Sequence, residues 1–185
     1  MVERPLLFTD DMVSAILAYK MTETRRLQSN LHAARVKEGD HLWVREAWAN
    51  ISVGHTANSE LIVFRAADTR THYNGPWRPS IHLPRSASRI FLRVTSTRNE
   101  LLHDITETGA LAEGIVEVCN PATDKRMFSV RDHEAIIGRY RTAIEAYRAL
   151  WDIRNPQGLW ASNPVVRVIS FEIAERFTSH TYNNF

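Results

Sequence analysis

The chain has 185 residues, of which 44% are hydrophobic and 24% charged, and its formal net charge at pH 7 is +2. This length and composition predict one globular domain with a substantial core, and so small a charge does not indicate a nucleic-acid-binding protein. The single cysteine, Cys119, excludes an intramolecular disulfide and a cysteine-rich zinc site. We find no signal peptide and no apolar run of the roughly 18 residues that span a membrane, so we expect a cytoplasmic protein without membrane partners.

The first predicted elements are a short apolar strand and the helix that follows it. Residues 5–8 read Pro-Leu-Leu-Phe and predict the strand. Thr9, Asp10 and Asp11 can then cap a helix, because their side chains suit the positive end of its dipole. Apolar residues at helical spacing follow, and the helix is expected to end near Tyr19.

A polar segment that begins with Lys20 follows this helix and carries candidate chemistry. In an extended chain, Lys20, Thr24 and Arg26 point to one side, because side chains alternate across a strand. A lysine beside a threonine is a possible base and nucleophile, and arginine suits an anionic or carbonyl-bearing ligand. A solvated, charged helix end is the alternative interpretation of the same residues.

The middle of the chain predicts strands and a long loop. The loop, near 66–88, is rich in proline, aromatic and basic residues, among them His82 and Arg85. Long ordered loops of this kind are more often functional than spacers, so both side chains are candidates to orient a ligand. Alternating apolar residues predict strands near 42–48, 61–65 and 89–97.

A short helix is predicted within residues 103–115. Asp104 or Thr106 can cap its start, and Gly114 stands where a C-terminal glycine belongs. Glu113 is then at the helix C-terminus, the unfavourable end of the dipole for a carboxylate, which would raise its pKa.

The last third of the chain predicts a longer helix and a closing strand. Ser129 and Asp132 resemble a capping box, and apolar residues at alternating spacings of three and four follow, so we expect a helical insertion near 129–153. A strand near 165–173 then completes one domain, residues 1–177. The polar tail, 178–185, is expected to be flexible.

Five ordered blocks of the sequence, within roughly residues 4–174, resemble the ASCH family, most of all its phage and prophage branch. They are Thr22-x-Thr24-Arg25-Arg26, Gly39-Asp40-x-Leu42-Trp43-Val44-Arg45-Glu46-x-Trp48, Trp77-Arg78-Pro79-Ser80-Ile81-His82-Leu83-Pro84, Asp104-Ile105-Thr106-Glu107 through Ala112-Glu113-Gly114-Ile115, and Asn163-Pro164. The resemblance implies an α+β, PUA-like fold, a small mixed β-barrel flanked by helices. It also implies a cleft associated with RNA or nucleoside ligands.

A bacterial branch of that family consists of amidohydrolases that remove the acyl group from N4-acetylcytidine with Lys, Thr and Glu. The resemblance therefore implies that Thr24 and Glu113 are catalytic. The family places its lysine directly before the first threonine, where this chain has Met21, and Lys20 stands one position earlier. Lys20 is accordingly the candidate base that activates Thr24, or water attacks directly while Thr24 positions it.

The expected substrate is an N4-acylated cytidine, hydrolysed without a metal or other cofactor. Deaminase, metalloprotease, serine-hydrolase and phosphate-loop motifs are absent, and the histidines lack metal-ligand spacing. Two alternatives remain: a non-catalytic RNA-binding module, and an RNA-cleaving enzyme with Lys20 and His82 as acid and base. The residues expected to bind the ligand near the rim of the catalytic pocket or beside it are Arg26, Arg45, Glu46, His82 and Arg85.

Overall fold

A computed structural model describes residues 2–52, 59–66, 73–120, 125–132, 135–176 and 181–183 of the chain. Its elements are, in order, β1 (Glu3–Leu7), α1 (Asp10–Leu17), β2 (Glu23–Leu27), α2 (Leu31–Ala34), β3 (His41–Arg45), β4 (Trp48–Ser52), β5 (Ser59–Phe64), η1 (Ser80–His82), η2 (Arg85–Ala87), β6 (Ile90–Leu101), η3 (Leu102–Asp104), α3 (Glu107–Ala112), β7 (Val116–Asn120), β8 (Lys125–Asp132), β9 (Ala135–Tyr140), α4 (Ala143–Arg154), β10 (Val165–Arg176) and β11 (Thr181–Asn183).

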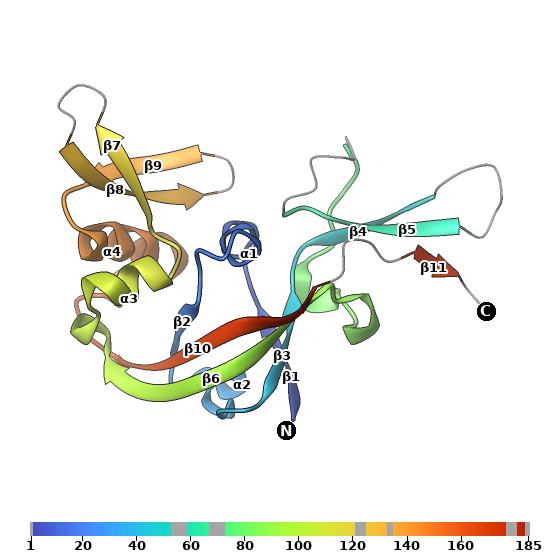
Figure 1. Ribbon diagram of the computed structural model, residues 1–185, viewed down its shortest axis with the longest axis horizontal. Coiled ribbons are helices and arrows are strands. Elements are labelled where there is room, and N and C mark those ends of the chain that lie inside the picture. Colours follow the sequence, from blue (N-terminus) through green and yellow to red (C-terminus); the bar gives the residue numbers. More distant parts are fainter. Residues whose placement is uncertain are drawn as a thin grey trace.

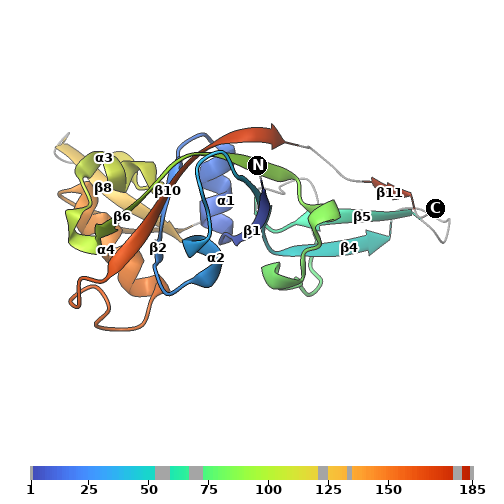
Figure 2. The ribbon, with the colours of Figure 1, turned by 90° about the horizontal axis from the view of Figure 1, so that it is seen from below.

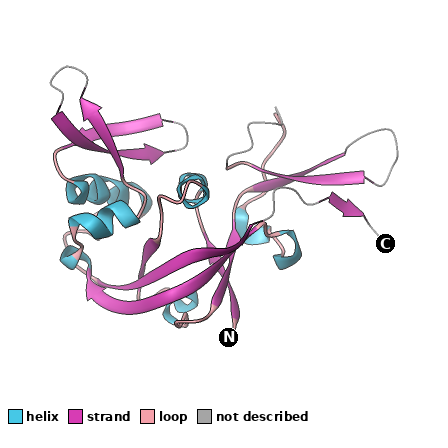
Figure 3. Ribbon diagram, viewed as in Figure 1, coloured by secondary structure: helices cyan, strands magenta, loops and turns pink. Residues whose placement is uncertain are grey.

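The strands form three sheets, which confirms the α+β class (Figure 3). The largest has the order β1-β3-β6-β10-β2, with β1 parallel to β3 and the other pairs antiparallel. The predicted closed barrel is not formed by the described residues, because β1 and β2 stay at opposite edges of this sheet. The two smaller sheets have the orders β11-β5-β4 and β7-β8-β9.

The long strands β6 and β10 run through the molecule and connect its two ends. Figure 1 shows the β7-β8-β9 sheet with α3 and α4 at one end, and β4, β5 and β11 at the other. Helix α1 lies between these ends, and the view from below agrees (Figure 2). The site described below lies where α1 meets the end that carries α3 and α4.

Strand β10 contributes to two different cores because its side chains alternate. Val168 packs in a core with residues of α3, α4 and β8, whereas Ile169 packs in a core with residues of α1, β1, β3 and β6. Its neighbour β2 pairs Arg25 with Val168 and Thr24 with Ile169. Since paired residues share a sheet face, Arg25 and Thr24 lie on opposite faces.

Helix α1 ends as the sequence predicts, with Tyr19 immediately beyond its last turn. The amide of Lys20 donates to the carbonyl of Ala15 and that of Tyr19 to Ile16, the two hydrogen bonds of a Schellman motif. Tyr19 has φ +57°, the left-handed conformation that favours glycine, and its side chain is 71% exposed. The motif fixes the direction in which the chain leaves α1 toward β2.

We expect Tyr19→Gly to stabilise the protein by about 0.5–1 kcal/mol, because glycine adopts the left-handed conformation without the penalty that a Cβ brings. The exposed ring gives up little when it is removed. Urea unfolding followed by tryptophan fluorescence measures the change. Tyr19→Ala is the control, since alanine keeps the Cβ. Equal midpoints for the two variants would contradict the explanation.

The predicted helix at 129–153 is wrong in its first half. Residues 125–132 and 135–140 form the antiparallel strands β8 and β9, and the helix begins only at Ala143. The capping box is formed by Thr142 and Glu145 rather than by Ser129 and Asp132. The residues of β8 form a strand rather than a helix because strand pairing buries Phe128 and Val130 against α4. The apolar spacing of three and four continued across both elements and concealed the boundary.

The remaining segments agree with the sequence in part. Thr106 caps α3, accepting a hydrogen bond from the amide of Gly109, as one of the two predicted caps. The 3-10 helices η1 and η2 lie in the predicted loop, of which residues 67–72 are outside the described residues. In the predicted tail, 181–183 form β11, and the rest lies outside the described residues. No helix in the described part is both long and apolar enough to span a membrane.

Candidate functional site

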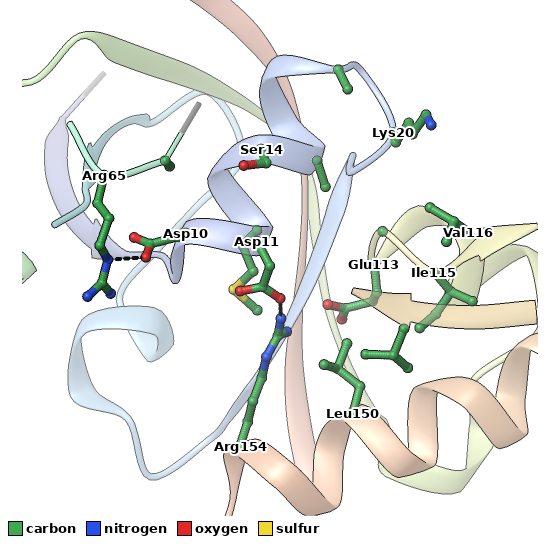
Figure 4. Close-up of a pocket in the computed structure, with 16 residues that line it drawn as sticks. Asp10, Asp11, Ser14, Lys20, Arg65, Glu113, Ile115, Val116, Leu150 and Arg154 are labelled. Carbon is green, nitrogen blue, oxygen red and sulfur yellow. Dashed lines mark hydrogen bonds and ion pairs between the residues drawn. The ribbon is translucent and has the colours of Figure 1, made fainter. Parts of the chain in front are cut away.

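A cavity of about 570 Å³ lies between α1, the segment that joins α3 to β7, and the end of α4 (Figure 4). This volume is typical of sites that enclose a small organic ligand. Its charged lining residues are Asp10, Asp11, Lys20, Arg65, Glu113 and Arg154. Its apolar wall includes Met12, Ile115 and Leu150. We call it the first cavity.

Glu113 is the most deeply buried acid of the first cavity, with only 3% of its surface exposed. Its carboxylate accepts from Nη1 of Arg25 at 3.3 Å and from the hydroxyl of Tyr147 at 3.5 Å. Burial raises the pKa of Glu113 to about 7, because the loss of hydration outweighs the attraction of Arg25 and Arg26. A carboxyl with this pKa can both take and give a proton at neutral pH.

The backbone around Glu113 explains how the carboxyl reaches this position. Glu113 is the C-cap of α3, as predicted, and Gly114 turns the chain with φ +94°. A Cβ on Gly114 would lie 3.2 Å from that of Ala15 in α1, so glycine also permits the close approach of this helix. Met21 forms a β-bridge with Glu113. The exit from α1 is thereby attached to the end of α3.

Arg25 holds the Glu113 carboxylate from the sheet. It lies in β2 and is buried, with Nε 2.8 Å from Glu100 and Nη1 3.3 Å from Glu113. It also donates to the carbonyl of Gly109 in α3. This one guanidinium therefore connects β2, β6 and α3, and it offsets the buried charge of Glu113.

Lys20 lines the first cavity, but at its exposed rim. Figure 4 shows its side chain directed away from the Glu113 carboxylate. Met21, at the position where the ASCH resemblance expects lysine, is buried in the core beside α1. The structure thus brings Lys20 and Glu113 to one cavity without placing the amine against the acid.

Thr24 is not among the residues that line the first cavity. Its side chain is fully buried, and its hydroxyl has no hydrogen-bond partner among the described residues. It lies on the face of β2 opposite Arg25, which binds Glu113. The predicted convergence of Lys20, Thr24 and Glu113 is therefore not what the structure shows: two of the three meet, and Thr24 remains in the core.

The other predicted ligand-binding residues also lie outside the first cavity. Glu46 is buried in an ion pair with Arg89, 2.8 Å away. The guanidinium of Arg45 stacks over Trp43, and that of Arg85 pairs with Glu3. His82 is exposed in η1. Arg26 lines a neighbouring cavity, described below.

Comparisons with known proteins add little to this geometry. No protein-family model matches the chain, and no curated protein matches it. A crystal structure of protein EF3133 from Enterococcus faecalis V583, described as family DUF984, is similar over 98% of this chain and 86% of that chain. The identity is 10% and the TM-score 0.47, a likeness too remote to bear on function.

Sequence reasoning missed two ion pairs that flank the first cavity. Asp10 pairs with Arg65 and Asp11 with Arg154, which connects the start of α1 to β5 and to the end of α4 (Figure 4). Both aspartates had only been interpreted as helix caps. Burial lowers the pKa of Arg154 to about 10. Among the described residues, no three His, Cys, Asp or Glu side chains are grouped to hold a metal ion.

Proposed function

We propose that the protein is an amidohydrolase that removes the acyl group from N4-acylated cytidine in the first cavity. One observation carries the proposal: Glu113, with a pKa of about 7, is buried in the wall of a cavity of nucleoside size. Carboxyl groups with pKa values raised toward neutrality are the usual acids and bases of hydrolytic sites. The five sequence blocks that resemble the ASCH family, with its PUA-like fold, supply the substrate class.

In this proposal the nucleophile is water and not Thr24, because Thr24 lies outside the first cavity. Glu113 takes a proton from water as the oxygen attacks the acyl carbonyl carbon. It then gives that proton to N4 of cytosine as the C–N bond breaks, which yields cytidine and a carboxylic acid. Lys20, at the rim, supplies positive charge for the oxyanion that develops on the carbonyl oxygen.

A second candidate is a binding module that holds an RNA or nucleoside ligand without hydrolysis. It is favoured by the outward direction of Lys20, since the family's lysine is catalytic and this one does not approach Glu113 (Figure 4). No comparable observation favours the RNA-cleaving alternative, because the first cavity that Lys20 lines does not include His82.

The test is to incubate the protein with N4-acetylcytidine and measure cytidine by chromatography from pH 5 to 9. We expect kcat/KM to rise with pH and to level off above about 7, because Glu113 must lose its proton to act as base. Binding of N4-acetylcytidine without cytidine formation would identify a binding module. A rate that is independent of pH through this range would remove Glu113 from the mechanism.

A further inference from the structure

A second cavity, of about 490 Å³, is lined by Arg154, which also lines the first cavity and pairs there with Asp11. It is lined by residues of β2, by the turn before α2 and by α4. Met12, Leu150 and Arg154 line both cavities. The two cavities are therefore neighbours.

The second cavity is lined by cations without acids. Arg25, Arg26 and Arg154 all contribute to its wall, and none of its described lining residues is an aspartate or a glutamate. Neutral polar groups complete the wall, with Ser29 and Asn155 among them. This lining differs from that of the first cavity, where three carboxylates are present.

Arg26 gives the second cavity its uncompensated charge. Arg25 and Arg154 pair with carboxylates, but no described carboxylate lies within ion-pair distance of Arg26. Its Nη2 donates to the carbonyl of Leu7 at 2.8 Å and lies 3.8 Å from the sulfur of Met12, and its Nε has no hydrogen-bond partner within the described part of the chain. Burial accordingly lowers the pKa of Arg26. Glu113 attracts this guanidinium from beyond ion-pair distance, and an anionic ligand in direct contact would offset more of the cost of its burial.

We propose that the second cavity binds a phosphate group, so that the ligand of the first cavity is a cytidine nucleotide and not a free nucleoside. This inference rests on the proposed function for the base, and on the three arginines for the phosphate. Arginine presents planar, paired donors that match phosphate oxygens. In this proposal the nucleoside lies in the first cavity, and its phosphate reaches past Met12, Leu150 and Arg154, which line both cavities, into the second.

Calorimetric titration with cytidine, cytidine 5′-monophosphate and inorganic phosphate tests the proposal. We expect the monophosphate to bind about 10- to 100-fold more tightly than cytidine at low salt, the range for hydrogen bonds to charged groups. This advantage should shrink as salt is added. Arg26→Gln should remove most of it. Arg35→Gln is the matched control, because Arg35 is exposed and lines neither cavity.

Equal affinity for cytidine and its monophosphate would overturn the proposal, as would equal losses in Arg26→Gln and Arg35→Gln. Tight binding of inorganic phosphate without any preference for the monophosphate would also overturn it, because the cavities would then not act together. If Arg26→Gln fails to fold, Arg26→Lys, which keeps the charge, must retain a preference for the monophosphate. None of these ligands carries an acyl group, so their binding is measured independently of hydrolysis. A preference for the monophosphate in a protein that forms no cytidine from N4-acetylcytidine would refute the proposed function and leave the phosphate site standing.

Discussion

Replacing Glu113 by glutamine is expected to lower the rate of N4-acetylcytidine hydrolysis by a factor of about 10² to 10⁴, the usual loss when a general acid–base group is removed. Glutamine fits the same space but neither accepts nor gives a proton. Initial rates of cytidine formation measure the effect. Glu172→Gln makes the same chemical change on the surface, where Glu172 is 53% exposed, and should keep the wild-type rate.

The same substitution is expected to change how stability depends on pH. The pKa of Glu113 rises from 4.5 in the unfolded chain to about 7 in the folded protein, so the folded protein binds more protons between these values. Stability therefore falls as pH rises from about 4.5 to 7, by about 3 kcal/mol from this group. Glu113→Gln removes this part of the slope.

Urea unfolding at pH 5 and pH 8 distinguishes the two proteins. Buried Glu46, whose pKa is also raised by burial, contributes the same slope to both, so the difference between them reports Glu113 alone. We expect Glu113→Gln to be at least as stable as the wild type at pH 8. A variant that is less stable at pH 8 than at pH 5 by the wild-type amount would show that Glu113 does not contribute to the pH dependence of stability in this range.

The position of Glu113 could be predicted from the sequence because the signals are local. A cap at Thr106 and a glycine at 114 define a short helix, and both were present in the chain. For β2, the sequence predicts which side chains lie on the same face of the strand, but not which face is turned toward α3. Alternation separates Thr24 from Arg25, but which of them faces α3 depends on pairing with β10, more than a hundred residues away in the sequence.

The ion pair between Asp11 and Arg154 was beyond sequence reasoning for a similar reason. The two residues are 143 positions apart, and each had a sufficient local explanation as a charge that suits its own helix end. The boundary between β9 and α4 was missed because spacings of three and four recur by chance in a strand that adjoins a helix. Only strand pairing reveals it.

The second large effect is expected from Arg25→Met, which removes the cation that holds Glu113. Breaking a buried ion pair by removing one partner costs about 3–5 kcal/mol, because the other charge remains buried without compensation. At pH 8, where Glu113 is charged, we expect a loss of stability in that range. At pH 5 the loss should be smaller by about 1 kcal/mol, because a carboxyl with a pKa of about 7 gains only that much from ionisation at pH 8 and can keep its proton once the cation is gone.

Arg98→Met is the matched control for this variant. Arg98 shares Glu23 and Glu100 with Arg25 but does not contact Glu113, and its side chain is 44% exposed. Exposed pairs of this kind contribute about 0–1 kcal/mol, with little dependence on pH between 5 and 8.

The double variant Arg25→Met with Glu113→Gln completes the cycle. If the pH-dependent part of the cost of Arg25→Met comes from the charge of Glu113, that part should be absent from the double variant, because no buried carboxylate remains without a cation. Urea unfolding of all four proteins at pH 5 and pH 8 measures the coupling. A double variant as unstable at pH 8 as Arg25→Met would instead assign the role of Arg25 to its contacts with Glu100 and the carbonyl of Gly109, and not to the acid in the first cavity.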